Sequence, residues 1–226
     1  MMKVMVFAAH PDDEIIGVGG TLAKHVRQGD SVSAVIMAEG KSSRKTDYEK
    51  PEESVMQHSA QETEQALSTL GIHDFVRLNL PDNRMDSMDL LDVVKEAEKQ
   101  INRFQPDIVY TQYGGDINID HSVVFRAVMT ATRPLPGHTV KRVFAYETLS
   151  STEWNYCQKD QFHANFFVNI EDELETKLKS MACYGSELRD FPHPRSLQAI
   201  EHNARVWGAK SGFSAAEAFM LVRGTW

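Results

Sequence analysis

The sequence predicts a single Rossmann-like α/β domain, with a mostly parallel sheet and helices on both faces. Short apolar runs rich in strand-forming residues alternate with longer segments of helical periodicity, which is typical of βαβ units. The 226 residues, 42% of them hydrophobic, suffice for one domain with a full core. Because no repeat, low-complexity tract or linker divides the chain, we expect one domain over residues 1–226.

The strands are predicted where bounded apolar runs occur between turn signals. Six runs meet this description: 4–8, 31–38, 75–80, 107–111, 140–146 and 165–170. Three polar connections between elements are expected to be loops: 39–51, 81–84 and 150–161. Segment 215–219 follows a predicted turn at Gly208 and Gly212, and no helix or strand is predicted for it.

The helices are predicted where apolar residues recur at helical spacing. Four helices are predicted over 52–70, 90–104, 171–184 and 193–207. Two more are predicted from their starts, one near Asp13 and one at about Asp120. Stop signals support the first four ends along the chain, because Gly29-Asp30, Gly71, Pro106 and the two prolines of 133–137 follow them.

Composition excludes several classes of protein. The formal net charge of −8 argues against a nucleic-acid binder, which needs a basic face, although it leaves room for a local basic pocket. No apolar run reaches membrane-spanning length, and the N-terminus lacks a signal-peptide pattern, so we expect a cytoplasmic protein. The two cysteines, Cys157 and Cys183, form no metal-type pair and predict no disulfide framework.

The most informative stretch is Ala-His-Pro-Asp-Asp-Glu at residues 9–14, directly after the first predicted strand. Ligands of open α/β sheets bind in the crevice at the carboxyl ends of the strands. Carboxylates in a first helical turn also favour the helix dipole, and that explanation suits Glu14 best. It does not account for His10 or for the doubled aspartates. Histidine and aspartate are common zinc ligands, and a further carboxylate can take a proton from water, but spacing alone does not say which aspartate does which.

A second polar stretch follows the fourth predicted strand and ends in Asp120-His121, at the start of a helix. A lone histidine there is usually a satisfied polar residue. With His10 expected at the neighbouring strand end, His121 instead becomes the candidate third ligand of a catalytic zinc site, which needs three protein ligands and an open position.

These motifs resemble the LmbE-like (PIG-L) zinc-dependent N-deacetylases. The family's Ala-His-Pro-Asp-Asp-Glu box is matched without a change, and the family's third ligand is a histidine of an Asp-His pair. The resemblance implies that His10, Asp13 and His121 bind zinc and that Asp12 is the general base. It also covers Arg195-Ser196 and 216–219, and so reaches nearly the whole chain.

The sequence departs from one version of the family pattern at Asn118, where many members carry a second histidine. An asparagine amide can donate to an oxyanion but cannot shuttle a proton near neutral pH, so we expect Asp12 to act as base and then as acid. Asp116 either assists or caps a turn. Asp82 and Arg84, in a segment similar to one that approaches the substrate in the family, are candidate substrate contacts together with Asn118.

The resulting hypothesis is removal of an N-acetyl group from an amino sugar or glycoconjugate, with Zn²⁺ or another divalent ion such as Fe²⁺ as cofactor. Two alternatives stay open: an amidase on another N-acyl substrate such as a thiol conjugate, and a metabolite-binding protein without turnover.

Lys41, Arg44 and Lys45 suggest a solvated loop or a lid over an anionic group. The glycines of 17–20 do not form a dinucleotide-binding fingerprint, and Gly19 and Gly20 are expected to allow close helix–sheet packing. A homo-oligomer is possible.

Overall fold

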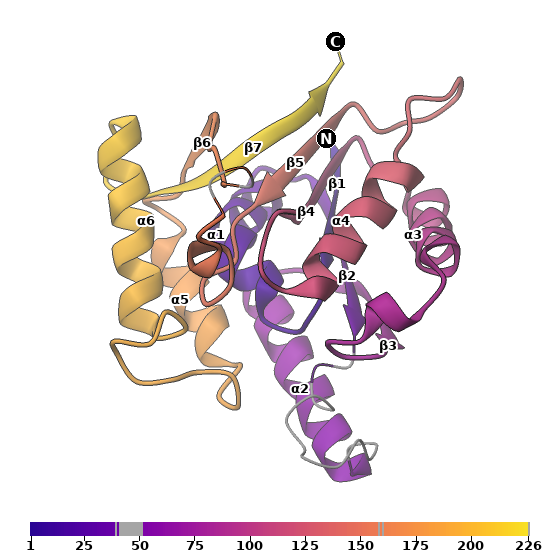
Figure 1. Ribbon diagram of the computed structural model, residues 1–226. Coiled ribbons are helices and arrows are strands. Elements are labelled where there is room, and N and C mark those ends of the chain that lie inside the picture. The colour runs from indigo at the N-terminus through magenta and orange to yellow at the C-terminus, as the bar shows by residue number, and fades with distance from the viewer. Residues whose placement is uncertain (39, 41–51, 158, 160, 226) are drawn as a thin grey trace.

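The computed structural model describes residues 1–38, 40, 52–157, 159 and 161–225 and contains one seven-stranded sheet flanked by helices (Figure 1). The proposed lid with Lys41, Arg44 and Lys45 lies outside the described residues. The elements, in chain order, are β1 Lys3–Ala8, α1 Asp13–Arg27, β2 Ser31–Ala38, α2 Glu53–Thr69, β3 Asp74–Leu80, the 3₁₀ turn η2 Met85–Ser87, α3 Leu90–Phe104, β4 Ile108–Gln112, α4 Ile119–Ala131, β5 Arg142–Tyr146, the 3₁₀ turn η3 Thr152–Trp154, β6 Phe166–Asn169, α5 Leu174–Ala182, α6 Leu197–Ser211 and β7 Ala216–Gly224.

The strand order is β3-β2-β1-β4-β5-β7-β6. The first five strands pair in parallel, whereas β7 runs antiparallel to both β5 and β6. The mostly parallel α/β fold is therefore confirmed. Strand β7 was not predicted, because its first four residues are all buried and include a glutamate, so the apolar alternation of a strand is absent.

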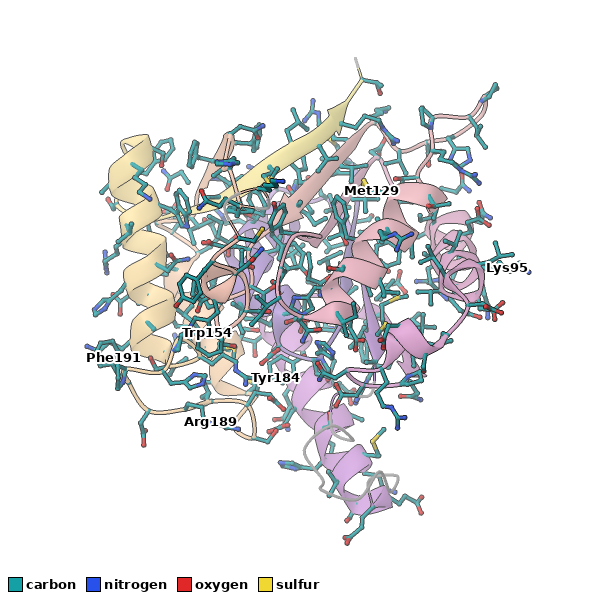
Figure 2. The ribbon with its side chains drawn as sticks, in the orientation of Figure 1. Lys95, Met129, Trp154, Tyr184, Arg189 and Phe191 are labelled. Atoms are coloured by element: carbon teal, nitrogen blue, oxygen red, sulfur yellow. The ribbon has the colours of Figure 1, made fainter. Side chains whose placement is uncertain are left out.

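Each face of the sheet carries its own apolar core. Residues of α1, α2, α5 and α6 pack on one face, and residues of α3 and α4 pack on the other. In Figure 1, α3 and α4 lie together at the right, and α5 and α6 lie at the left. Figure 2 shows the side chain of Tyr184, which is fully buried, within the molecule, while Phe191 and Lys95 project from its periphery.

The last helix differs from its prediction at both ends. It begins after Ser196, whose hydroxyl accepts a hydrogen bond from Ala199 N at 3.1 Å and caps the helix. It continues through Gly208, which was expected in a turn. A Cβ at Gly208 would meet the backbone of Ala215 at 2.8 Å, so glycine allows the helix to approach the following chain closely.

The glycines of α1 allow close packing, although Gly19 does not face the sheet as expected. A Cβ at Gly17 would collide with the Tyr146 ring of β5, and one at Gly20 would meet Ile170 at 2.8 Å. A Cβ at Gly19 would instead lie 3.4 Å from the side chain of Lys177 in α5. Helix α1 can therefore lie close to both the sheet and α5.

Strands β1 and β4 are adjacent and parallel, so the loops after them meet at one edge of the sheet. His10 follows β1, and His121 lies in the first turn of α4 after β4. In the described ranges, no helix has the length and apolar character needed to cross a membrane.

Candidate metal site and its cavity

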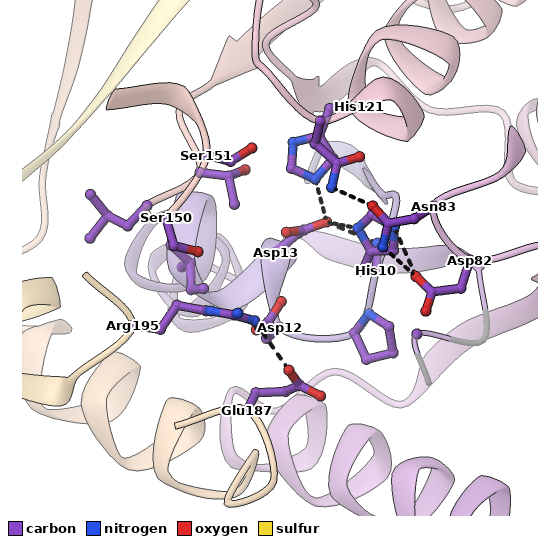
Figure 3. Close-up of a pocket in the computed structure, with 16 residues that line it drawn as sticks. His10, Asp12, Asp13, Asp82, Asn83, His121, Ser150, Ser151, Glu187 and Arg195 are labelled. Atoms are coloured by element: carbon purple, nitrogen blue, oxygen red, sulfur yellow. Dashed lines mark hydrogen bonds and ion pairs between the residues drawn. The ribbon is translucent and has the colours of Figure 1, made fainter. Parts of the chain in front are cut away.

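His10, Asp13 and His121 converge at this edge of the sheet (Figure 3). Asp13 Oδ2 lies 3.4 Å from His10 Nδ1 and 3.3 Å from His121 Nε2. The two imidazole rings are tilted by 44°, with centroids 5.4 Å apart. Two segments more than a hundred residues apart thus bring together the three side chains that were singled out as metal ligands.

Each of the two histidines has a carboxylate beside one of its ring nitrogens. Asp120 Oδ2 lies 3.0 Å from His10 Nε2, and Asp116 Oδ2 lies 3.0 Å from His121 Nδ1. Metal-binding histidines usually donate their second ring N–H to a carboxylate, a backbone carbonyl or a water, which fixes the tautomer and orients the ring. Asp116 was expected either to assist the reaction or to cap a turn. It lies where a residue that orients His121 would lie.

Other bonds hold these carboxylates in place. Asp120 accepts backbone N–H groups of Asn83 at 2.6 Å and Met85 at 2.9 Å, which ties the loop after β3 to α4. Asp116 accepts hydrogen bonds from Ser151 Oγ and, at 2.8 Å, from Thr152 Oγ1. Backbone amides of the loop after β3 and hydroxyls of the loop after β5 thereby hold the carboxylates that orient both histidines.

The charges of the site suit a cation. Burial alone would lower the pKa of His121, but the carboxylates of Asp13 and Asp116 outweigh it and raise the pKa to about 9. The pKa of His10 is raised in the same way, mainly by its hydrogen bonds to Asp120 and Asp13. A metal bound at these nitrogens would compete with protons for them.

The donor set fits a divalent transition metal. Two histidine nitrogens and one carboxylate oxygen lie within 4.8 Å of one another, and Asp13 Oδ2 contacts both histidines. A second group of His10, Asp82 and Asp120 is equally compact. We favour the first group, since both oxygens of Asp120 already accept backbone amides.

Asp12 lies beside this group, on the side away from His121 (Figure 3). Its carboxylate is buried, and Arg195 Nη1 approaches it at 3.5 Å while also binding Glu187 at 3.2 Å. Burial, with the charges of Asp13 and Glu187, raises the pKa of Asp12 well above its usual value against the opposing effect of Arg195. A carboxyl with a raised pKa is suited to accepting a proton.

Glu14 and Gln112 hold the two aspartates. Glu14 is fully buried; it accepts the Asp12 amide at 3.2 Å and the Tyr184 hydroxyl at 2.6 Å. Gln112, the last residue of β4, donates to Asp13 Oδ2 at 2.9 Å. The helix-dipole explanation of Glu14 is thus incomplete, because its side chain also anchors the backbone at Asp12.

His10, Asp12, Asp13 and His121 border a cavity of about 290 Å³. Its far wall comes from the loop after β5, where Thr148 is buried and its Oγ1 has no hydrogen-bond partner in the described part of the chain. Arg195 and Glu187 line the cavity next to Asp12, on the side away from His121 (Figure 3). Sequence reasoning assigned no site role to Thr148, Glu187 or Gln112, and only their long-range contacts reveal one.

The three candidate substrate contacts lie in different settings. Asn118 lines the cavity; its Oδ1 caps α4 at Asp120 N, and its Nδ2 donates to Asn83. Asp82 also lines the cavity, but it is buried 3.3 Å from His10 Nε2. Arg84 is exposed and is not among the described residues that line the cavity.

Comparison with known proteins gives consistent matches. The model of the PIG-L family, described as GlcNAc-PI de-N-acetylase, matches residues 5–132. The chain is 32% identical over 178 residues to the uncharacterized deacetylase YaiS of Escherichia coli (strain K12), covering 76% of this chain and 84% of that protein. It is 24% identical over 230 residues to diacetylchitobiose deacetylase of Thermococcus kodakarensis, covering 98% of this chain and 84% of that one.

The fold is also similar to that of GalB, the 4-carboxy-2-hydroxymuconate hydratase of Pseudomonas putida KT2440. The TM-score is 0.80 at 19% identity, and the match covers 100% of this chain and 98% of that chain. The architecture is thus shared by proteins of different named activities, so that the function must be argued from the site itself.

Proposed function

The chain belongs to the PIG-L family, and we propose that it is a metal-dependent deacetylase that removes an N-acetyl group from an amino sugar or glycoconjugate. The observation that carries this proposal is the convergence of His10, Asp13 and His121 beside the buried Asp12, at the bottom of a polar cavity. Such an arrangement suits hydrolysis, because ligands for a Lewis acid lie next to a proton acceptor.

In this proposal His10, Asp13 and His121 hold the metal, with zinc as the expected ion and iron as an alternative. Once bound, the metal would polarise the acyl carbonyl and lower the pKa of water at the site. Asp12 takes the proton from the attacking water at its carboxylate and returns it to the leaving amine. Asp116 and Asp120 keep the two histidines in the orientation that ligation needs.

The cavity provides hydrogen-bonding groups for a hydroxyl-rich substrate. Asn118 would stabilise the developing oxyanion, and Thr148 and Arg195 would contact the substrate's hydroxyl or acyl groups. Asp82 and Arg84 remain candidate substrate contacts, with Arg84 at the greater distance from the cavity. The preference for a sugar rests on the relatives, one of which is named a diacetylchitobiose deacetylase.

The test is acetate release by the purified protein after reconstitution with zinc or iron. N-acetylglucosamine and N,N'-diacetylchitobiose represent the sugar class, and N-acetylcysteine conjugates represent other N-acyl substrates. We expect acetate and a free amine in equal amounts from a sugar, with loss of turnover after chelation and recovery on adding metal.

Each alternative predicts a different outcome. Release from the thiol conjugate but not from sugars would identify an amidase of another specificity. If metal bound but no acyl substrate turned over, a binding protein without catalysis would be favoured. A protein that released acetate undiminished after complete metal removal would refute the metal-dependent mechanism.

A further inference from the structure

A second cavity, of about 170 Å³, lies at the opposite end of the sheet from the metal site. It is bordered by Ile108 and Arg142, the first residues of β4 and β5, and by the second half of α1. The metal site lies at the carboxyl ends of the same strands. The second cavity is therefore separate from the proposed reaction, and none of that chemistry explains its polar lining.

Two of its polar groups lack partners within the described chain. Thr21 is 1% exposed, and its Oγ1 makes no hydrogen bond to any described residue, although a helical threonine commonly bonds the preceding turn. The Arg142 guanidinium likewise forms no hydrogen bond or ion pair with another described residue. Buried polar groups are normally satisfied, so the buried unpaired hydroxyl of Thr21 indicates a missing ligand, and the half-buried Arg142 offers a cation in the lining of the same cavity.

The charge of the lining is positive. Arg142 and Lys24 both border the cavity, whereas no carboxylate is found among the described residues that line it. Two carboxylates near this side are already engaged: Asp30 lies 2.8 Å from His25 Nδ1, and Glu217 accepts the Thr21 amide at 2.7 Å. In a chain of net charge −8, this is a local basic pocket, and it favours an anion.

Hydrogen-bond donors and aromatic walls complete the lining. His25 Nε2 lies 3.3 Å from the Tyr110 hydroxyl, and burial raises the pKa of Tyr110, so the phenol keeps its proton. Phe144 and Phe166 form the apolar side, with ring centroids 4.8 Å apart. An anion with an apolar body would therefore match both parts of the lining.

We propose that this cavity binds a small organic carboxylate, whose charged group pairs with Arg142 and Thr21 and whose apolar body lies against Phe144 and Phe166. Guanidinium groups match carboxylates with two parallel hydrogen bonds. The volume of about 170 Å³ is well below the roughly 300 Å³ at which sites for drug-sized ligands begin, so a compact acid such as benzoate fits the class.

The experiment is titration of the full-length, metal-loaded protein with benzoate, followed by calorimetry and by ligand-observed NMR. Benzamide, which has the same shape without the charge, is the matched ligand control. Arg142→Met and Thr21→Val remove the two unpaired groups, and Arg133→Met is the control variant, since Arg133 is exposed at the end of α4.

We expect saturable benzoate binding that Arg142→Met weakens at least about tenfold, as loss of a charge-assisted bond would. Thr21→Val should weaken it less, and Arg133→Met should leave it unchanged. Benzamide should bind at least about tenfold more weakly than benzoate. Circular dichroism melting confirms that each variant is folded, and Arg142 is only half-buried, so its replacement keeps the fold.

Three results would overturn the proposal. Binding that neither Arg142→Met nor Thr21→Val alters would place benzoate elsewhere, for example on the metal. Equal binding of benzamide would mean that the cavity selects shape rather than charge. Absence of saturable binding up to millimolar benzoate would show that the cavity takes no acid of this class.

Discussion

Asp12 holds a backbone conformation that residues other than glycine rarely adopt, with φ at 106°. Conformations of this kind cost about 1–3 kcal/mol each and persist where the surroundings over-determine them. Here the Asp12 amide binds Glu14, and its carbonyl accepts Ile15 N and Ile16 N at 3.0 and 2.9 Å. The strained position presents Asp12 to the cavity, next to Arg195, while Asp13 faces the histidines.

The first prediction separates these two aspartates. Asp12→Asn keeps the shape and hydrogen bonds of the site but removes the proton acceptor, so kcat should fall by about 10²- to 10⁴-fold. Because Asp12 is not among the proposed ligands, metal content measured by elemental analysis should stay at the wild-type level. Loss of metal in parallel with activity would instead assign ligation to Asp12.

A second prediction concerns the carboxylates behind the histidines. Asp120→Asn should weaken metal affinity by about 10- to 100-fold, because His10 loses the acceptor that orients it. Asp116→Asn should act similarly through His121. Competition with a chromogenic chelator measures both affinities. Asp82→Asn is the matched comparison: an equal loss there would favour the alternative group of His10, Asp82 and Asp120 as the site.

At the scale of the elements, α1 is fixed by a buried ion pair from two later elements. Lys177 of α5 and Glu217 of β7 pair at 2.6 Å, each side chain about 4% exposed. Glu217 accepts the amides of Gly20 and Thr21, at 2.9 and 2.7 Å, and Lys177 donates to the carbonyl of Ile16 at 2.7 Å. The helix that begins with Asp13 is thereby tied to the C-terminal strand.

The third prediction tests this connection. Lys177→Met leaves Glu217 charged and buried without its partner, which should lower the free energy of unfolding by about 3–5 kcal/mol. Lys179→Met, on the same helix but exposed in a pair with Glu175, should change stability far less. Urea denaturation measures both. Equal effects of the two variants would mean that the buried pair contributes no more than the exposed one.

The elements also show what the sequence could predict. The strands of the parallel sheet and the helices between them follow from local apolar patterns, and the candidate metal ligands lie in short motifs at strand ends. Strand β7 and the contacts of Gln112, Glu187 and Arg195 depend on residues that meet only in the folded chain. Arg195 is 183 positions from Asp12, and no local pattern carries that information.

At the scale of the whole molecule, the proposed metal would link the start of the chain to its middle. His10 and Asp13 lie between β1 and α1, and His121 lies in α4, which packs on the opposite face of the sheet from α1. A ligand that binds only the folded state stabilises it by mass action. The unfolded chain cannot hold these three side chains together, so binding and folding should be coupled.

The last prediction follows from this coupling. Zinc at about a thousand times its dissociation constant should stabilise the protein by about 4 kcal/mol, which for a chain of this size raises the melting temperature by roughly ten degrees. Differential scanning calorimetry of chelated and zinc-loaded protein measures the shift. His121→Asn should abolish most of it, because only two strong ligands remain. A shift of the same size in that variant would place the zinc outside the group of His10, Asp13 and His121, and the separate chain segments would then lack the ion that the mechanism requires between them.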